Sequence, residues 1–277
     1  MRKRHRSILR GILIVLLLIW TLFPIYWMVS LSVRDQSELM GDKPFWPQSF
    51  SLSHFQELFE KSDFPRAVGN SLEVTLISTA AALLFGLMCA YVLARTRFHF
   101  RFRGPALVWS FLVRILPPIA FALPLYIMMN AADLLNTKIP VILAHILMNL
   151  PFVIWFMMVS FEGMPEEIEE SARIDGASEG KIFWSIVLPV SAPGIAAVSI
   201  LSFMTSWNEY LYGVIFVQRP QNFTIPISLS TFNSEQELTH WGALMAGGVV
   251  SMLPIVLFVI FTQRFLIQGL SGGAVKE

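Results

Sequence analysis

Long stretches of apolar residues almost free of charge constrain this chain more than any other feature of its sequence. The hydrocarbon core of a bilayer is about 30 Å thick, and an α-helix needs about 20 apolar residues to cross it. Six windows of at least that length contain no charged side chain or a single ionisable one: residues 11–33, 74–94, 104–132, 139–161, 190–218 and 241–263. The sequence therefore predicts an all-α polytopic membrane protein with six transmembrane helices, forming one transmembrane domain over residues 1–277.

Composition excludes several other classes of protein. Hydrophobic residues make up 55% of the chain and charged residues only 14%, whereas soluble domains carry about a quarter charged residues. This apolar composition leads us to expect membrane lipid as a partner. The net charge of +1 provides no excess of Lys and Arg to bind a phosphate backbone, so we expect no nucleic acid partner. The one cysteine, Cys89, can form no disulfide within the chain, and we interpret it as a small buried apolar residue.

Basic residues predict how the spans are oriented. An even number of spans places both termini on one side. That side carries 13 Lys and Arg residues in the N-terminus, the 95–103 turn, the 162–181 loop and the C-terminal end, against 6 on the other side. The excess predicts that both termini are cytoplasmic. The basic start imitates a signal peptide, but its apolar run is too long and lacks a small-x-small cleavage site, so we expect a retained first helix.

Two features of the spans concern packing. Small residues recur every four positions in the second window, at Ala82, Gly86, Ala90 and Ala94. This spacing places them on one helix face and predicts a close contact between helices. Prolines interrupt the third and fourth windows, at Pro117, Pro118, Pro124 and Pro151. We expect kinks there, either as packing geometry or as part of a gate.

The loop over residues 162–189 predicts a helix, a turn and a second helix. Pro165 suits a first helical position, and four glutamates follow it near the positive end of the helix dipole. Asp175-Gly176 predicts a stop with a left-handed residue, and Ser178 can cap the second helix. That helix would present an apolar face before Pro189 ends it, formed by Ile182, Phe183, Ile186 and Val187. We expect this face to bind a partner.

The same residues resemble a known family. Glu170-Ser171-Ala172, then Gly176, then Ile186-x-Leu188-Pro189 resemble the EAA loop of ABC-importer permeases, the element that docks in a cleft of the ATPase subunit; Ser171 stands where the family usually has alanine. The resemblance implies these ATPase-coupling residues: Glu170, Ser171, Ala172, Asp175, Gly176, Ala177, Ile186, Leu188 and Pro189. From Asn70-Ser71-Leu72 through Trp207-Asn208-Glu209 to the 269–276 tail, the chain is similar to the carbohydrate, MalG-like branch.

This resemblance implies a permease subunit of an importer for a sugar or sugar-like solute in a bacterial or archaeal plasma membrane, working by alternating access. Its expected partners are a homologous permease subunit, two ABC ATPase subunits and an extracytoplasmic solute-binding protein. The chain has no phosphate-binding loop, because Gly180-Lys181 is followed by Ile182 without the upstream glycine, and it has no hydrolase or metalloprotease motif. We therefore expect no enzyme activity, cofactor or metal on this chain, with ATP and Mg bound by the ATPase subunits. The alternative is a self-contained channel or an ion-coupled secondary carrier.

Ionisable groups inside the spans are candidates for a substrate pathway, because burying them in a membrane is costly. They are Arg114, His145 and Glu209, the last within Trp207-Asn208-Glu209-Tyr210. Aromatic faces beside an amide and a carboxylate suit a sugar, so these four residues could line its path. Alternatively, Glu209 could pair with Arg114 or with a cation of the partner subunit as a clamp between helices. We expect His145 to be a hydrogen-bonding group inside the bundle.

Two segments are predicted to face outward. Residues 34–66 combine six acidic and four basic residues with Phe45, Trp46 and Phe55, and we interpret this segment as a solvated loop with interfacial aromatic residues. Residues 219–240 resemble the family's loop that reaches toward the solute-binding protein, with residues 233–236 as its polar tip; the alternative is an inert turn.

Overall fold

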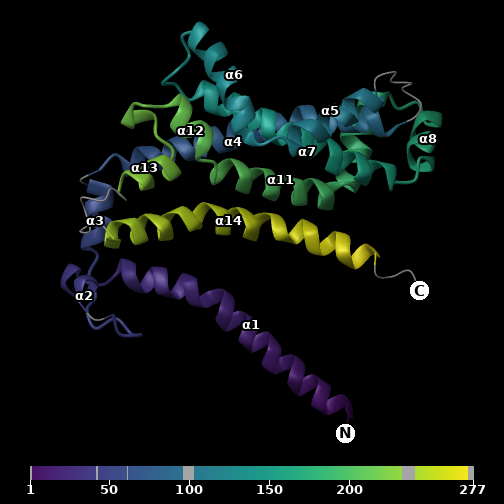
Figure 1. The fold of residues 1–277 in the computed structure, drawn as a ribbon. Helices are drawn as coiled ribbons and strands as arrows, with labels where there is room; N and C mark the ends of the chain where they lie inside the picture. The colour runs from purple at the N-terminus through teal and green to yellow at the C-terminus, as the bar shows by residue number, and fades with distance from the viewer. Residues whose placement is uncertain (1, 42, 61, 96–102, 233–240, 274–277) are drawn as a thin grey trace. The chain divides into compact units, whose positions relative to one another are not determined.

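The computed structural model describes residues 2–41, 43–60, 62–95, 103–232 and 241–273, which form helices joined by short connections with no strand among them. This confirms the all-α class. The long helices are α1 (Arg2–Ser32), α4 (Phe64–Ala94), α7 (Ile139–Glu162), α11 (Ala192–Trp207) and α14 (Trp241–Gly273) (Figure 1). The shorter elements are α2 (Gln36–Met40), α3 (Ser53–Glu60), α5 (Arg103–Ile115), α6 (Pro118–Ala131), α8 (Glu167–Ile174), α9 (Glu179–Ile182), the π-helical turn η2 (Phe183–Val187), α10 (Leu188–Val190), α12 (Leu211–Phe216), the 3-10 turn η3 (Pro220–Asn222) and α13 (Ile225–Thr231).

Several of these helices are long and apolar enough to cross a membrane. Four qualify singly: Leu9–Ser32, Phe64–Ala94, Ile139–Glu162 and Trp241–Gln263. Two more candidates are bent pairs, since α5 meets α6 at 100° and the segment Glu179–Val190 meets α11 at 78°. The first bend falls at Pro117, where a kink was predicted, whereas α7 continues through Pro151. The count is six only if each bent pair is one span, so six spans stay a prediction.

The residues group into two compact units. Unit 1 consists of residues 1–65 and 228–253, and unit 2 of residues 66–227 and 254–277. The single transmembrane domain over 1–277 stays a prediction.

Within unit 1, the buried Arg34 guanidinium holds the end of α1 to the segment that follows: it donates to the Pro44 carbonyl at 2.6 Å and lies 3.2 Å from the Glu38 carboxylate. The Ser49 hydroxyl donates to Glu38 and lowers the pKa of that carboxyl group below its usual value.

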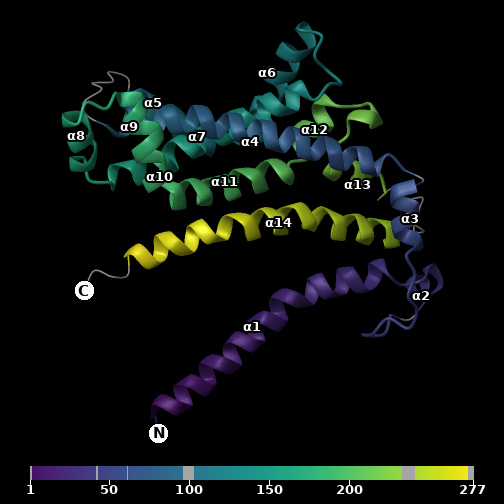
Figure 2. The ribbon, with the colours of Figure 1, turned by 180° about the vertical axis from the view of Figure 1, so that it is seen from behind.

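In unit 2, α4, α5, α7 and α11 run side by side (Figures 1 and 2). The predicted small-residue face of α4 is buried at Ala82, Ala90 and Ala94. A Cβ atom added at Gly86 would lie 2.6 Å from Cγ1 of Val153 on α7. This distance is far below van der Waals contact, so the close approach of α4 to α7 depends on the glycine. The prediction of a helix contact along this face is confirmed.

The core of unit 2 has two apolar clusters separated by a polar layer. One cluster joins the second halves of α4 and α7 to Ile182, Phe183 and Val187. The other joins Val74 of α4, Val141 and Ala144 of α7, and Tyr212 and Phe216 of α12. Between them along the helices lies what we call the polar layer, whose buried members are Thr75, Ser78, Thr79, His145, Asn149, Ser202 and Ser206. Polar side chains are costly in mid-membrane, so this layer is a candidate functional region.

The connection between α12 and α13 is tied to the start of α4. Asn70 donates its amide hydrogens to the carbonyls of Gln221 and Phe223, both at 2.9 Å, and the Ser71 hydroxyl accepts the N–H of Ile225 at 2.7 Å. Asn70 and Ser71, which contributed to the family resemblance, therefore satisfy backbone groups that would otherwise be buried without partners.

Cys89 is exposed at the surface of the chain, so the expectation of a buried thiol is wrong. An apolar sequence context does not separate a core position from a lipid-facing one, because lipid tails are as apolar as leucine.

Candidate functional site

The loop between α7 and α11 has the predicted helix–turn–helix form. α8 ends at Ile174, and Gly176 follows in a left-handed conformation with φ of +83°. The Ser178 hydroxyl then accepts the N–H of Lys181 and caps α9. Glycine adopts this backbone region without the strain that a Cβ atom would add. The local sequence thus determines the turn between the two helices.

The predicted coupling residues divide between two faces of this loop. Ala172, Ala177, Ile186 and Leu188 pack against the chain's own apolar cluster. Those on the solvent side are Glu170, Ser171, Asp175, Gly176 and Pro189. Beside them Ile174 is 87% exposed, which is unusual for a large apolar side chain outside the membrane spans. The loop therefore presents an outer surface of mixed polar and apolar character, which we call the docking face.

Two details of the second helix differ from expectation. Its apolar face was expected to bind a partner, but Ile182, Phe183 and Val187 are buried in the chain's own core. Pro189 was expected to end the helix, yet the helix continues to Val190. The π turn explains this. The N–H of Leu188 donates to the carbonyl of Phe183 and the N–H of Ser191 donates to the carbonyl of Val187, so backbone hydrogen bonds continue on both sides of Pro189, which has no N–H to donate. The break comes at Ser191 instead.

Sequence reasoning missed the buried groups that hold α8 to α4. The Glu169 carboxylate is fully buried and accepts hydrogen bonds from the Tyr91 hydroxyl at 2.8 Å and from Arg95 Nε at 2.8 Å. We call Tyr91, Arg95 and Glu169 the Glu169 anchor. A signal was present in the sequence: Glu169 stands three residues before Ala172 and so shares the inward face of α8.

Glu209 lies beside the polar layer, at the break between α11 and α12. Its Oε2 atom is 3.2 Å from Nε2 of the buried His145, and its Oε1 atom accepts the N–H of Tyr212 at 2.9 Å. His145 thus lies inside the bundle, as predicted, against the carboxylate. Asn149, one turn further along α7, donates to the Ser206 hydroxyl of α11 at 2.8 Å. These contacts join α7 to α11 through polar groups.

The four tentative pathway residues do not converge on one surface. Trp207 is buried and stacks on Phe203 with ring centroids 5.7 Å apart, whereas Asn208 and Tyr210 are exposed. Glu209 turns inward to His145. Arg114 was considered as its partner, but that guanidinium lies 4.5 Å from the centroid of the Phe152 ring. Within the described residues, Glu209 thus contacts His145 of α7, and its role as a clamp between helices stays a prediction.

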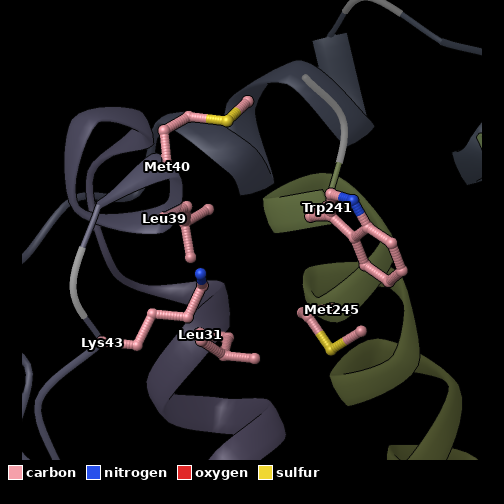
Figure 3. Close-up of a pocket in the computed structure, with 6 residues that line it drawn as sticks. All are labelled: Leu31, Leu39, Met40, Lys43, Trp241 and Met245. Carbon is pink, nitrogen blue, oxygen red and sulfur yellow. The ribbon is translucent and has the colours of Figure 1, made fainter. Parts of the chain in front are cut away.

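Unit 1 contains a cavity of about 300 Å³ between the end of α1, α2 and the start of α14 (Figure 3). Its walls are mainly apolar, and Lys43 and Trp241 supply the polar atoms. None of the predicted site residues lines it.

Phe45 and Trp46 of the same unit are exposed, as expected of interfacial residues. The predicted tip at 233–236 lies outside the described residues. Within the described ranges, no cluster of His, Cys, Asp or Glu is arranged to hold a metal ion.

An all-helical fold with several helices long and apolar enough to cross a membrane is typical of a multi-pass membrane protein. Residues 82–272 match the family of binding-protein-dependent transport system inner membrane components. The chain belongs to this family, and it is a permease subunit of an ABC importer.

Two relatives illustrate its closeness to named members. The chain is 32% identical over 263 residues to the diacetylchitobiose uptake system permease protein DasC of Streptomyces coelicolor, covering 95% of this chain and 94% of the relative. It is 30% identical over 275 residues to the trehalose transport system permease protein SugB of Mycobacterium tuberculosis, covering 98% of both.

Solved structures share the fold. A chain in the crystal structure of a bacterial ABC transporter involved in the import of the acidic polysaccharide alginate superposes with a TM-score of 0.75 at 20% identity, covering 95% of this chain and 97% of that one. A second, from a bacterial alginate ABC transporter in complex with an alginate pentasaccharide-bound periplasmic protein, gives a TM-score of 0.69 at 16% identity and covers 94% of each chain.

Proposed function

We propose that this chain imports a sugar or oligosaccharide as one half of a permease pair, with two ATPase subunits on the cytoplasmic side and a solute-binding protein on the other. ATP is hydrolysed on the ATPase subunits, and both termini of this chain are cytoplasmic. The observation that carries the proposal is the docking face: an anchored helix pair that exposes Glu170, Ser171 and Ile174. Exposed apolar side chains rimmed by polar residues are typical of a protein interface, and α8 exposes Ile168 as well as Ile174.

The turn at Gly176 provides the test of ATPase docking. A Cβ atom there would meet no neighbouring atom of this chain within 4 Å, so within the permease a substitution acts through backbone strain. Gly176→Val places a β-branched residue at positive φ, which costs about 1–3 kcal/mol, whereas Gly176→Asn introduces a residue that tolerates this region. We expect Gly176→Val to lose co-purification of the ATPase subunits and Gly176→Asn to retain most of it.

The measurement is the molar ratio of ATPase subunits to tagged permease after detergent purification, with membrane insertion checked by blot. Equal ratios for wild type, Gly176→Val and Gly176→Asn would contradict the role of this turn. A wild-type chain that purifies without ATPase subunits and transports in liposomes without ATP would contradict the importer assembly itself.

A sugar or oligosaccharide is proposed as solute because the relatives are named for diacetylchitobiose and trehalose uptake and share nearly their whole length with this chain. The complex of an alginate transporter with a periplasmic protein supports the binding-protein partner. ATP-dependent uptake of a panel of labelled mono-, di- and oligosaccharides into liposomes, with and without the cognate binding protein, tests both points. Uptake of none of the sugars, or uptake independent of the binding protein, would contradict them.

A further inference from the structure

The buried Glu169 carboxylate faces away from the docking face, and its burial requires a reason. A carboxylate removed from water loses several kcal/mol of solvation unless charged partners and hydrogen bonds replace it. Here the replacement is specific, because Arg95 Nη2 lies 2.7 Å from one carboxylate oxygen and the Tyr91 hydroxyl donates to the other. Tyr91 stands in the last turn of α4, and Arg95 directly follows its last residue, Ala94. These costly buried contacts therefore fix the position of α8 relative to the end of α4.

We infer that Glu169 is a positioning residue that transmits movement of the docking helices to α4. The inference rests on the proposed function, because it concerns the same loop. Apolar contacts between α8 and the core are non-directional and allow sliding. The forked guanidinium of Arg95, by contrast, contacts its carboxylate in one geometry, with Nε and Nη2 both at Oε1. Displacement of α8 therefore moves the end of α4.

Arg173 extends the connection to the second docking helix. Its Nη2 atom lies 3.4 Å from Glu169, and its Nε atom donates to Glu179 of α9 at 2.8 Å. Arg95 also approaches Glu166 at 3.7 Å, just before α8. The docking pair is thus held as one body and attached to α4 at its inner side.

The other end of this path is the contact between α4 and α7. The half of α4 that carries Tyr91 and ends just before Arg95 also carries the small-residue face that contacts α7 at Gly86. A shift of the α4 end changes that contact directly. In the importer, the Glu169 anchor therefore sets how much solute crosses for each ATP hydrolysed, and Glu169 does not itself touch the ATPase subunits.

The test separates docking from transmission in the reconstituted full importer. Glu169→Gln keeps the side-chain shape and removes the charge. We expect the mutant to bind ATPase subunits in the wild-type ratio and to continue hydrolysing ATP, while uptake per ATP falls by about 5-fold or more, the lower range of coupling effects between sites. Tyr91→Phe, which removes one hydroxyl, should produce a smaller fall, and the double variant should fall no further than Glu169→Gln alone, since the two act as one unit.

The matched control is Glu73→Gln, an exposed glutamate in the first half of α4 and outside the docking loop, which should leave uptake per ATP unchanged. An unchanged ratio for both Glu169→Gln and Tyr91→Phe overturns the inference. So does a fall confined to variants that have also lost ATPase binding or thermal stability, because that shows a merely structural role. Failure of the wild-type chain to bind ATPase subunits would overturn the proposed function instead.

Discussion

At the scale of single residues, Glu209 shows how this protein tolerates a carboxylate within an apolar stretch. Its two oxygens accept the N–H groups of Tyr212 and Gly213 at the start of α12, and one of them lies against His145. The first N–H groups of a helix have no partner within the helix, so the carboxylate satisfies them. Glu209 thus stabilises the break between α11 and α12 and joins it to α7.

This arrangement predicts the outcome of Glu209→Gln. An amide has one acceptor oxygen and one donor nitrogen, so in either orientation the nitrogen faces a backbone N–H, that of Tyr212 or that of Gly213. Leaving a buried donor unsatisfied costs about 1–3 kcal/mol. We expect a lower melting temperature of the assembled complex in detergent, with the half-saturating solute concentration little changed.

The control for that experiment is Glu73→Gln. Glu73 forms an exposed ion pair with Lys138, of the kind that contributes about 0–1 kcal/mol, so its loss should leave the melting temperature almost unchanged. If Glu209→Gln instead keeps the melting temperature and raises the half-saturating concentration several-fold, Glu209 contacts the solute, and Trp207 and Asn208 become pathway candidates with it.

At the scale of elements, some helices are continuous and closely packed, whereas others are interrupted. α4 approaches α7 because small residues line one of its faces, whereas α5–α6 and α11–α12 are interrupted at Pro117 and at the Asn208–Tyr210 stretch. The continuous helices form the close contact, and the break between α11 and α12 places polar backbone next to the polar layer, where Glu209 accepts its N–H groups. In a membrane such irregular backbone is tolerated only where protein or water satisfies it.

The α4–α7 contact can be tested by adding one methyl group. Gly86→Ala places a Cβ atom 2.6 Å from Val153 Cγ1, and overpacking of this kind typically costs about 1–3 kcal/mol. We expect a lower melting temperature, restored in the double variant Gly86→Ala with Val153→Ala, where the space is freed. Gly69→Ala on the same helix meets no atom within 4 Å and should be neutral or slightly stabilising. A drop in Gly86→Ala that Val153→Ala does not relieve would place the cause elsewhere.

At the scale of the whole molecule, the bilayer is the solvent that explains the surface. None of residues 9–29 of α1 is buried within the chain, and Cys89 on α4 is exposed. In water such a surface would aggregate, but in lipid or against another permease subunit it is stable. The basic residues predict the orientation of the chain, because the larger number of them is expected on the cytoplasmic side.

Orientation predicts which positions an impermeant reagent reaches. In a Cys89→Ala background, a cysteine at Gln221, exposed in η3, should react with an impermeant maleimide in intact spheroplasts. A cysteine at Glu179, exposed in α9, should react only after the membrane is opened. Labelling of Glu179→Cys from outside, with Gln221→Cys protected, would reverse the orientation inferred from 13 against 6 basic residues.

The loop over residues 162–189 shows which structural features could be predicted from the sequence. Gly176 and Ser178 were assigned their turn and cap correctly, because such roles depend on a residue and its immediate neighbours. The face that Ile182 and Phe183 cover was misassigned to a partner, since an apolar periodicity reveals that a face is buried but not which surface buries it.

The sequence by itself determined the helical class, the apolar spans, the small-residue face of α4 and the family. These features depend on hydrophobic runs, fixed spacings and local backbone preferences, all of which are set by residues close together in the sequence. Only the tertiary structure decided that Glu169 is buried against Arg95, that His145 lies at Glu209, and that Cys89 is exposed. Such pairings join residues more than sixty positions apart, and their energy depends on burial and geometry that arise only when the helices pack.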